Sequence, residues 1–135
     1  DRYYEQGELP LNEGPQILKH GKDVFVVYSC GQSWLDTYKL SYLRLKDSDA
    51  DLLDPKSWIK SDKPVFEGTD QVFGVGHASF TTSPDDREHY IYYHTKKERK
   101  PGWKRDIRLQ KFTFDASGVP CFGKPLPVTP RSMAV

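Results

Sequence analysis

Two residues whose side chains can do chemistry stand beside glycines at the entrance to apolar segments. Glu13 lies in Asn-Glu-Gly-Pro (12–15), and His77 ends Gly-Val-Gly-His (74–77). A carboxyl group can transfer a proton, whereas an imidazole can hold a metal ion or contact a substrate. The adjacent glycines let the backbone approach a ligand closely. The simpler alternative is that Glu13 is a solvated turn residue and His77 a satisfied core histidine.

The other short motifs do not meet the requirements of a metal site or a nucleic-acid-binding site. One histidine is not a zinc site, because zinc takes three or four protein ligands. The acidic run at 47–54 resembles a calcium loop, but Leu52 stands where that loop needs glycine and Trp58 where it needs glutamate. The basic run at 96–100, beside Trp103, is interpreted as a solvated loop.

Composition restricts the classes of partner. The chain has 135 residues, which is the size of one domain, and its 20 basic and 19 acidic side chains give a net charge of +1. No strong attraction to nucleic acid or membrane is expected. No apolar run approaches the length of a membrane span, and the N-terminal residues do not resemble a signal peptide. Cys30 and Cys121 allow either one disulfide or two thiols.

The elements that must position Glu13 and His77 are predicted to be β-strands. Helical periodicity is almost absent, and short apolar or alternating segments are separated by turn signals. One helical turn is allowed within 48–58. The predicted strand segments are 16–18, 24–28, 38–45, 64–66, 78–82, 90–94 and 107–114.

These segments form an internal repeat. The apolar run that starts at 24 recurs at 90, an offset of 66, and Glu13 and His77 are offset by 64. Two units of some four strands each indicate two β-propeller blades, and a single eight-stranded sandwich is the alternative. Because two blades cannot close a propeller, this interpretation makes the chain part of a larger one. Glu13 and His77 are then expected to face the central channel from neighbouring blades.

The ordered set of motifs resembles glycoside hydrolase family 43, the five-bladed β-propeller arabinofuranosidases, xylosidases and arabinanases. The matching stretches are NEGPQILKHGKDVFVVYS, SWLDTYKLSYLRL, DPKSWIKSDKPVF, GVGHASFTTSPD, YIYYHTK and RDIRLQKFTFDASGVPCFGKP. The resemblance covers about residues 12–125. It implies that the chain is the C-terminal part of the propeller, with blades at approximately 10–70 and 71–130.

The resemblance also implies roles for individual residues. Glu13 matches the general acid, and His77 matches a histidine that holds a hydrated cation in the channel, with Ca²⁺ the first choice, although Val75 replaces the usual proline. Arg105 matches an arginine at the sugar-binding end of the channel, and Arg108 is the rival for that role. Further residues on loops that border the sugar pocket are Ser33, Trp34 and Phe73.

The implied activity is inverting hydrolysis of α-L-arabinofuranosyl or β-D-xylosyl linkages in plant polysaccharide by a secreted enzyme. The catalytic base of the family lies in earlier blades, so those N-terminal blades are an expected partner alongside the saccharide. Alone, the chain is expected to be inactive. The alternatives are a non-catalytic carbohydrate-binding or assembly module and a stand-alone β-sandwich interaction domain.

Overall fold

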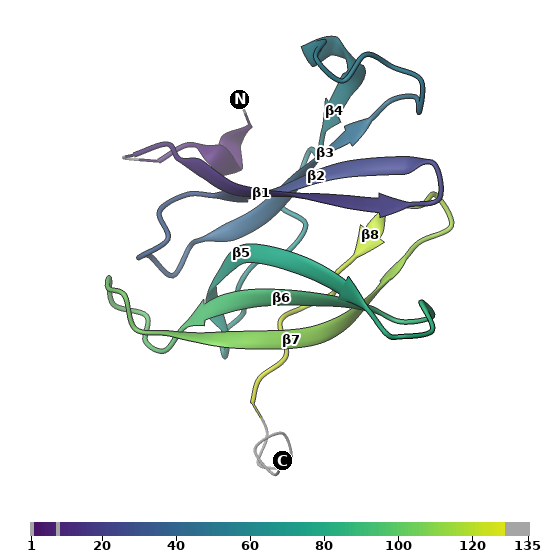
Figure 1. The fold of residues 1–135 in the computed structure, drawn as a ribbon. Coiled ribbons are helices and arrows are strands. Elements are labelled where there is room, and N and C mark those ends of the chain that lie inside the picture. Colours follow the sequence, from purple (N-terminus) through teal and green to yellow (C-terminus); the bar gives the residue numbers. More distant parts are fainter. Residues whose placement is uncertain (1, 8, 129–135) are drawn as a thin grey trace.

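Two antiparallel four-stranded sheets account for most of the regular structure in the computed structural model, which describes residues 2–7 and 9–128 (Figure 1). The first sheet contains β1 (Asn12–His20), β2 (Asp23–Cys30), β3 (Lys39–Leu45) and β4 (Trp58–Lys60). The second contains β5 (Phe73–Thr82), β6 (His89–Lys96), β7 (Arg105–Phe114) and β8 (Pro120–Cys121). Two 3₁₀ turns, η1 (Tyr3–Glu5) and η2 (Pro55–Ser57), complete the regular elements of these residues.

The strands of each sheet follow one another in chain order, β1-β2-β3-β4 and β5-β6-β7-β8. Such a four-stranded antiparallel meander is the arrangement of a propeller blade. Short turns set the register: β1 and β2 are joined through Gly21 and Lys22, and Gly21 has φ +57°. A positive φ is what tight hairpin turns require, and glycine adopts it without strain. The predicted all-β class is therefore confirmed.

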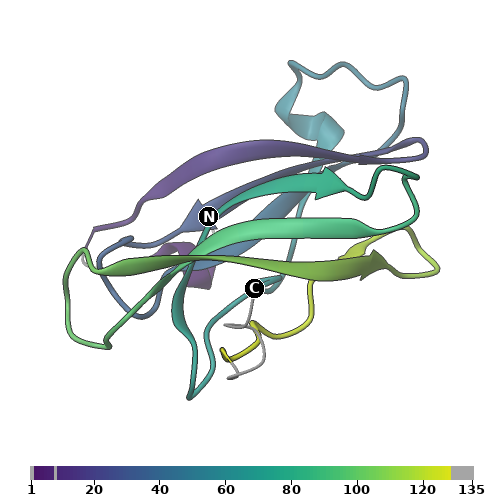
Figure 2. The ribbon, with the colours of Figure 1, turned by 60° about the horizontal axis from the view of Figure 1, so that its bottom comes forward.

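The main hydrophobic core lies between the two sheets, which are stacked as layers (Figures 1 and 2). β5 packs against β1, β2 and β3 and so forms the inner edge of the second sheet. The alternating pattern of each strand sends one set of side chains into this core. The buried residues at its centre include Phe25, Val27, Leu40, Phe66, Val75, Ile91 and Phe122.

Irregularities in β1 and β5 distinguish the first strand of each sheet. The register of β1 shifts between Glu13 and Gln16, and that of β5 shifts around Gly76. Each shift adds a residue to one strand of the pair, which is a β-bulge. Gly14 (φ +58°) lies in the first bulge and His77 (φ +54°) beside the second. Bulges redirect side chains, so Glu13 and His77 leave the regular alternation of their strands.

Several local predictions need correction. Glu13 and His77 lie inside β1 and β5, not ahead of them, because the bulges extend both strands toward their N-terminal ends. The segment 64–66 is no strand and pairs only through a bridge from Phe66 to Leu40.

Other local features follow the sequence more closely. The allowed helical turn is η2, where the Asp54 carboxylate accepts a hydrogen bond from the Lys56 N–H. Cys30 and Cys121 are free thiols, the first buried and the second exposed. Within 2–7 and 9–128 no helix has the length and apolar character needed to cross a membrane.

Candidate active site

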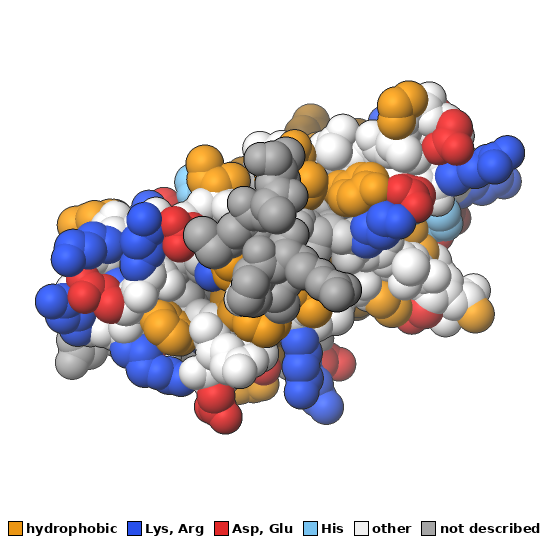
Figure 3. Space-filling model, turned by 90° about the horizontal axis from the view of Figure 1, so that it is seen from below, with side chains coloured by type: hydrophobic (Ala, Val, Ile, Leu, Met, Phe, Trp, Pro, Cys, Tyr) orange, Lys and Arg blue, Asp and Glu red, His pale blue; other side chains and the backbone are white. Residues whose placement is uncertain are grey.

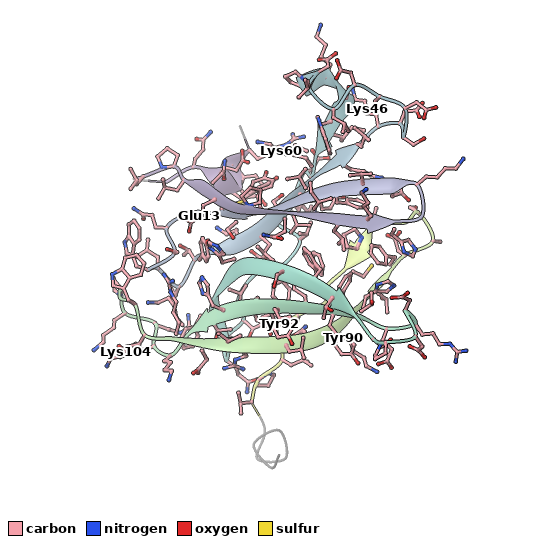
Figure 4. The ribbon with its side chains drawn as sticks, in the orientation of Figure 1. Glu13, Lys46, Lys60, Tyr90, Tyr92 and Lys104 are labelled. Atoms are coloured by element: carbon pink, nitrogen blue, oxygen red, sulfur yellow. The ribbon has the colours of Figure 1, made fainter. Side chains whose placement is uncertain are left out.

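The candidate site lies where β1, β5 and β7 begin, at one end of the two sheets. Figure 4 shows Glu13 on the first sheet at this end, and Lys104, in the β6–β7 loop, at the same end of the second. The loop between β2 and β3, residues 31–38, also reaches this end. Residues far apart in the sequence therefore meet here because the strands run antiparallel.

The side chain of Glu13 is exposed to solvent, but a hydrogen bond from a buried residue fixes its carboxyl group. The Tyr38 hydroxyl donates a hydrogen bond to Glu13 Oε1 over 2.7 Å. Tyr38 itself is fully buried, and burial raises the pKa of its hydroxyl, with the neighbouring Glu13 adding to the rise. The hydroxyl therefore keeps its proton and remains a donor to the carboxyl group.

Tyr38 occupies a slot that only glycine can form. A Cβ at Gly76 would lie 2.4 Å from Cε1 of the Tyr38 ring, far inside contact distance. The ring also stacks on His94, the cross-strand partner of Gly76, with centroids 5.3 Å apart and planes within 10°. Gly76 of the Gly-Val-Gly-His motif thus makes room for Tyr38, whose hydroxyl group holds the Glu13 side chain of the other motif.

His77 lies directly beside the Glu-Gly-Pro segment. A Cβ at Gly14 would lie 3.2 Å from the imidazole of His77, so the glycine leaves room for this ring beside β1. The His77 N–H donates to Ser29 Oγ over 2.8 Å, which ties β5 to β2 and fixes the unusual backbone conformation. The side chain is exposed. The structure therefore brings His77 next to Gly14, one residue from Glu13, although the Glu13 side chain lines a different hollow from that of His77.

His94 belongs to the site and was missed in the sequence. Burial, followed by the nearby charges of Arg105 and His77, lowers its pKa to about 4, so the ring is neutral near pH 7. Both ring nitrogens are buried without a hydrogen-bond partner among the described residues. His94 lines an open hollow together with His77 and Arg105. Its only sequence signal was a polar residue ending the apolar run YIYYH.

Arg105, and not its rival Arg108, lies in this hollow. The Arg105 Nη2 donates to the carbonyl of Ser33 over 3.1 Å, and its guanidinium lies 4.7 Å from the centre of the Trp103 ring. Arg108 instead donates to the carbonyl of Leu126. The two residues are an odd number of positions apart on β7, so they face opposite sides of the sheet.

The three pocket-loop residues divide between two places. Ser33 and Trp34 adjoin Arg105, the first through its carbonyl and the second through contact with Trp103, whose ring centre is 5.5 Å away. Phe73 lines a separate hollow with Asp36 and Arg99, whose guanidinium lies 4.8 Å from the Phe73 ring centre. The structure thus groups Ser33 and Trp34, but not Phe73, with Arg105.

The described residues offer little to a metal ion. Within 2–7 and 9–128, no three His, Cys, Asp or Glu side chains lie close enough together to hold a metal ion. His77 presents one exposed imidazole. This donor set does not fit a cation enclosed by protein ligands, although it leaves room for a largely hydrated ion with one imidazole contact.

The basic loop 96–100 is paired rather than free. Lys97 contacts Asp106, Arg99 contacts Asp36, and Lys100 contacts Glu98, with distances of 3.1–3.4 Å. Such exposed pairs are solvated and add little stability. The interpretation of this run as a solvated loop agrees with these contacts for 97–100, but it is wrong for Lys96, which ends β6 and is buried because its ammonium group donates to the Gly102 carbonyl.

Comparison with known proteins connects this geometry to a family of enzymes. The sequence profile described as "Glycosyl hydrolases family 43" matches residues 2–120. An "Extracellular exo-alpha-(1->5)-L-arabinofuranosidase" from Streptomyces avermitilis is 40% identical over 124 residues, which are 86% of this chain and 25% of that protein. "Alpha-L-arabinofuranosidase B" from Pyricularia oryzae is 34% identical over 97% of this chain and 28% of its own length.

Similarity extends to solved structures. The crystal structure of an alpha-L-arabinofuranosidase from Lactobacillus brevis has a TM-score of 0.86 and 34% identity, covering 94% of this chain and 41% of that protein. The likeness confirms the predicted propeller-blade fold. The chain spans about a quarter of the length of the curated relatives that it matches.

Proposed function

The chain belongs to glycosyl hydrolase family 43, and we propose on that basis that the whole protein hydrolyses α-L-arabinofuranosyl linkages in plant polysaccharide. The curated relatives named above are arabinofuranosidases, which favours arabinofuranosyl over β-D-xylosyl substrates. The relative from Streptomyces avermitilis is named as extracellular, and we propose the same location for this protein.

The observation that carries the proposal is the contact between Glu13 and Tyr38. A glutamate at a solvated turn would need no buried tyrosine to hold its carboxyl group, yet Tyr38 is enclosed by Gly76 and His94 and donates to Glu13 over 2.7 Å. Side chains are fixed by supporting contacts where their geometry matters for chemistry.

In the proposed mechanism Glu13 is the general acid. Its carboxyl group protonates the glycosidic oxygen as the bond to the anomeric carbon breaks, so the leaving sugar departs as an alcohol. Inversion requires a second carboxylate, roughly 6.5–9.5 Å from the first, to activate a water molecule on the opposite face of the sugar. We propose that this base comes from blades outside these 135 residues.

The other residues of the site bind the sugar. Arg105 supplies a guanidinium fixed by the Ser33 carbonyl, which is suited to hydrogen bonds with ring hydroxyl groups. Trp34 contacts Trp103, which in turn contacts Arg105, so Trp34 lies at the border of the same sugar site. Phe73 borders the substrate, in this proposal, from the separate hollow that it lines with Asp36 and Arg99. The hydrated cation, Ca²⁺ as the first choice, is likewise a proposal that rests on the single imidazole of His77.

The outer face of the second sheet supports a partnership with further blades. Ile107 is 83% exposed, Leu109 49% and Tyr92 41%, and all three lie on this face. Figure 4 shows Tyr92 and Tyr90 on it, and Figure 3 shows hydrophobic side chains among charged ones on the underside of the molecule. A neighbouring blade packed here would bury these side chains and would form one wall of the hollow with Arg105, which Tyr92 and Ile107 also line.

The test is an assay of the whole protein on aryl α-L-arabinofuranosides and aryl β-D-xylosides, with the anomer of the first product followed by NMR. We expect turnover of the arabinofuranoside with inversion, and none by the isolated 135 residues. Turnover by the isolated chain, abolished by Glu13→Gln, would refute the two-part site. Saccharide binding without hydrolysis by the whole protein would instead indicate a non-catalytic binding module.

A further inference from the structure

Two tryptophans from different blades meet at the rim of the site. Trp34 comes from the β2–β3 loop and Trp103 from the β6–β7 loop, and their ring centres are 5.5 Å apart with planes tilted by 47°. Trp103 remains 66% exposed, although it is one of the largest apolar side chains in the chain. Contact with its neighbours therefore leaves most of this indole open to solvent.

The backbone directly before the exposed indole is held by two hydrogen bonds, both made by Gly102. The Gly102 N–H donates to the carbonyl of Trp34 over 2.9 Å, which joins the two loops directly. The Gly102 carbonyl in turn accepts a hydrogen bond of 2.9 Å from Lys96 Nζ, and Lys96 is only 3% exposed. A buried ammonium is costly to desolvate, so this contact is a built feature and not a chance surface pairing.

Arg105 connects the tryptophans to the candidate active site. Its guanidinium stacks on Trp103 and also lines the hollow that contains His77 and His94. The exposed ring of Trp103 is therefore directly next to the hollow, with Arg105 between them. A flat, exposed aromatic ring is suited to a ring-shaped ligand, because a side chain with two rotatable bonds loses little conformational entropy when the ligand stacks on it.

We propose that Trp34 and Trp103, here called the tryptophan rim, form an accessory site for the sugar residue next to the one held in the hollow. Sugars present a face of C–H groups that packs on an indole, while their hydroxyl groups reach Arg105. The proposal rests on the proposed function for its substrate class. It adds that the enzyme reads at least two consecutive sugars, and that Trp103 supplies the second contact.

The experiment compares substrates of different length in the whole protein. Trp103→Ala should lower kcat/KM for a linear arabino-oligosaccharide by about two- to tenfold, the range that one aromatic contact contributes. The inhibition constant of free L-arabinose, which fills only the hollow, should change much less, because Arg105 keeps its hydrogen bond to the Ser33 carbonyl when the Trp103 ring is removed. Trp103→Tyr, which keeps a flat ring, should recover most of the loss.

Controls separate the possible failures. Tyr3→Ala removes another exposed aromatic residue, 71% exposed in η1, and should change neither value. Thermal unfolding of each variant shows whether the fold is intact. Equal kcat/KM for wild type and Trp103→Ala on the oligosaccharide, or a matching loss with L-arabinose, would overturn the tryptophan rim. If wild type cleaves no arabinofuranoside at all, the proposed function fails instead.

Discussion

The hydroxyl of Tyr38 donates to Glu13 Oε1 over 2.7 Å and so joins a fully buried ring to an exposed carboxyl group. Tyr38→Phe removes this bond and keeps the ring in its slot. Glu13 becomes negatively charged as it gives up its proton, and a hydrogen bond to a charged group contributes about 1.5–3 kcal/mol, so we expect kcat to fall by about tenfold or more while KM changes little. Steady-state kinetics of the whole protein check this.

The thermal midpoint of Tyr38→Phe should stay within a few degrees of wild type, since the buried ring is retained. An unchanged kcat would mean that the Tyr38 hydroxyl does not position the acid. A large fall in the midpoint would mean that the hydroxyl mainly supports the fold.

Gly76 makes the slot for Tyr38, and its replacement should affect stability and activity together. In Gly76→Ala the new Cβ would stand 2.4 Å from the ring, so the ring or the strand must move. Overpacking of this kind costs typically about 1–3 kcal/mol, and urea unfolding measures it. Gly7→Ala is the matched control, because a Cβ at Gly7 meets nothing within 4 Å. Equal stability of the two variants would contradict the slot.

His94 makes stability depend on pH in a defined window. Its pKa is lowered from 6.5 to about 4 in the folded chain, so between these values the unfolded chain binds more protons than the folded one. The free energy of unfolding therefore falls as the pH drops from about 6.5 to about 4, and below pH 4 the loss that His94 causes is complete. Unfolding by urea at several pH values measures the slope.

His94→Phe keeps a ring to stack on Tyr38 and removes the titration. We expect a smaller loss of stability between pH 6.5 and 4 in this variant than in wild type. Glu5 is a second acid-sensitive group, and it titrates at lower pH than His94. Burial would raise the pKa of Glu5, but hydrogen bonds from the Arg2 N–H, Lys60 and Tyr28 lower it to about 2. Identical slopes for wild type and His94→Phe would contradict the assignment to His94.

The parts of the site that sequence could predict are those carried by short motifs. Glu13 and His77 stand in glycine-containing runs whose spacing repeats with the blades, and the repeat alone indicated that the two runs lie side by side. Arg105 could not be separated from Arg108 by pattern, since both fit a short motif. The strand register separates them, because it places the two side chains on opposite faces of β7.

The supporting residues carried no motif. Tyr38 and His94 read as ordinary members of apolar strands, and their importance arises only when Gly76 and β5 bring them together. Trp103 lay in a charged loop whose path depends on the bond from Gly102 to Trp34. Such contacts join residues dozens of positions apart, and one sequence contains no local signal for them.

The role of Glu13 as general acid is tested most directly by Glu13→Gln in the whole protein with two arabinofuranosides. A dinitrophenyl leaving group departs without a proton, whereas an alkyl leaving group needs one. We predict that kcat/KM falls by about a thousandfold for the alkyl glycoside and by less than about tenfold for the dinitrophenyl glycoside. Asp49→Asn, in an exposed turn, should change neither. Equal loss on both substrates, or no loss on either, would contradict the account.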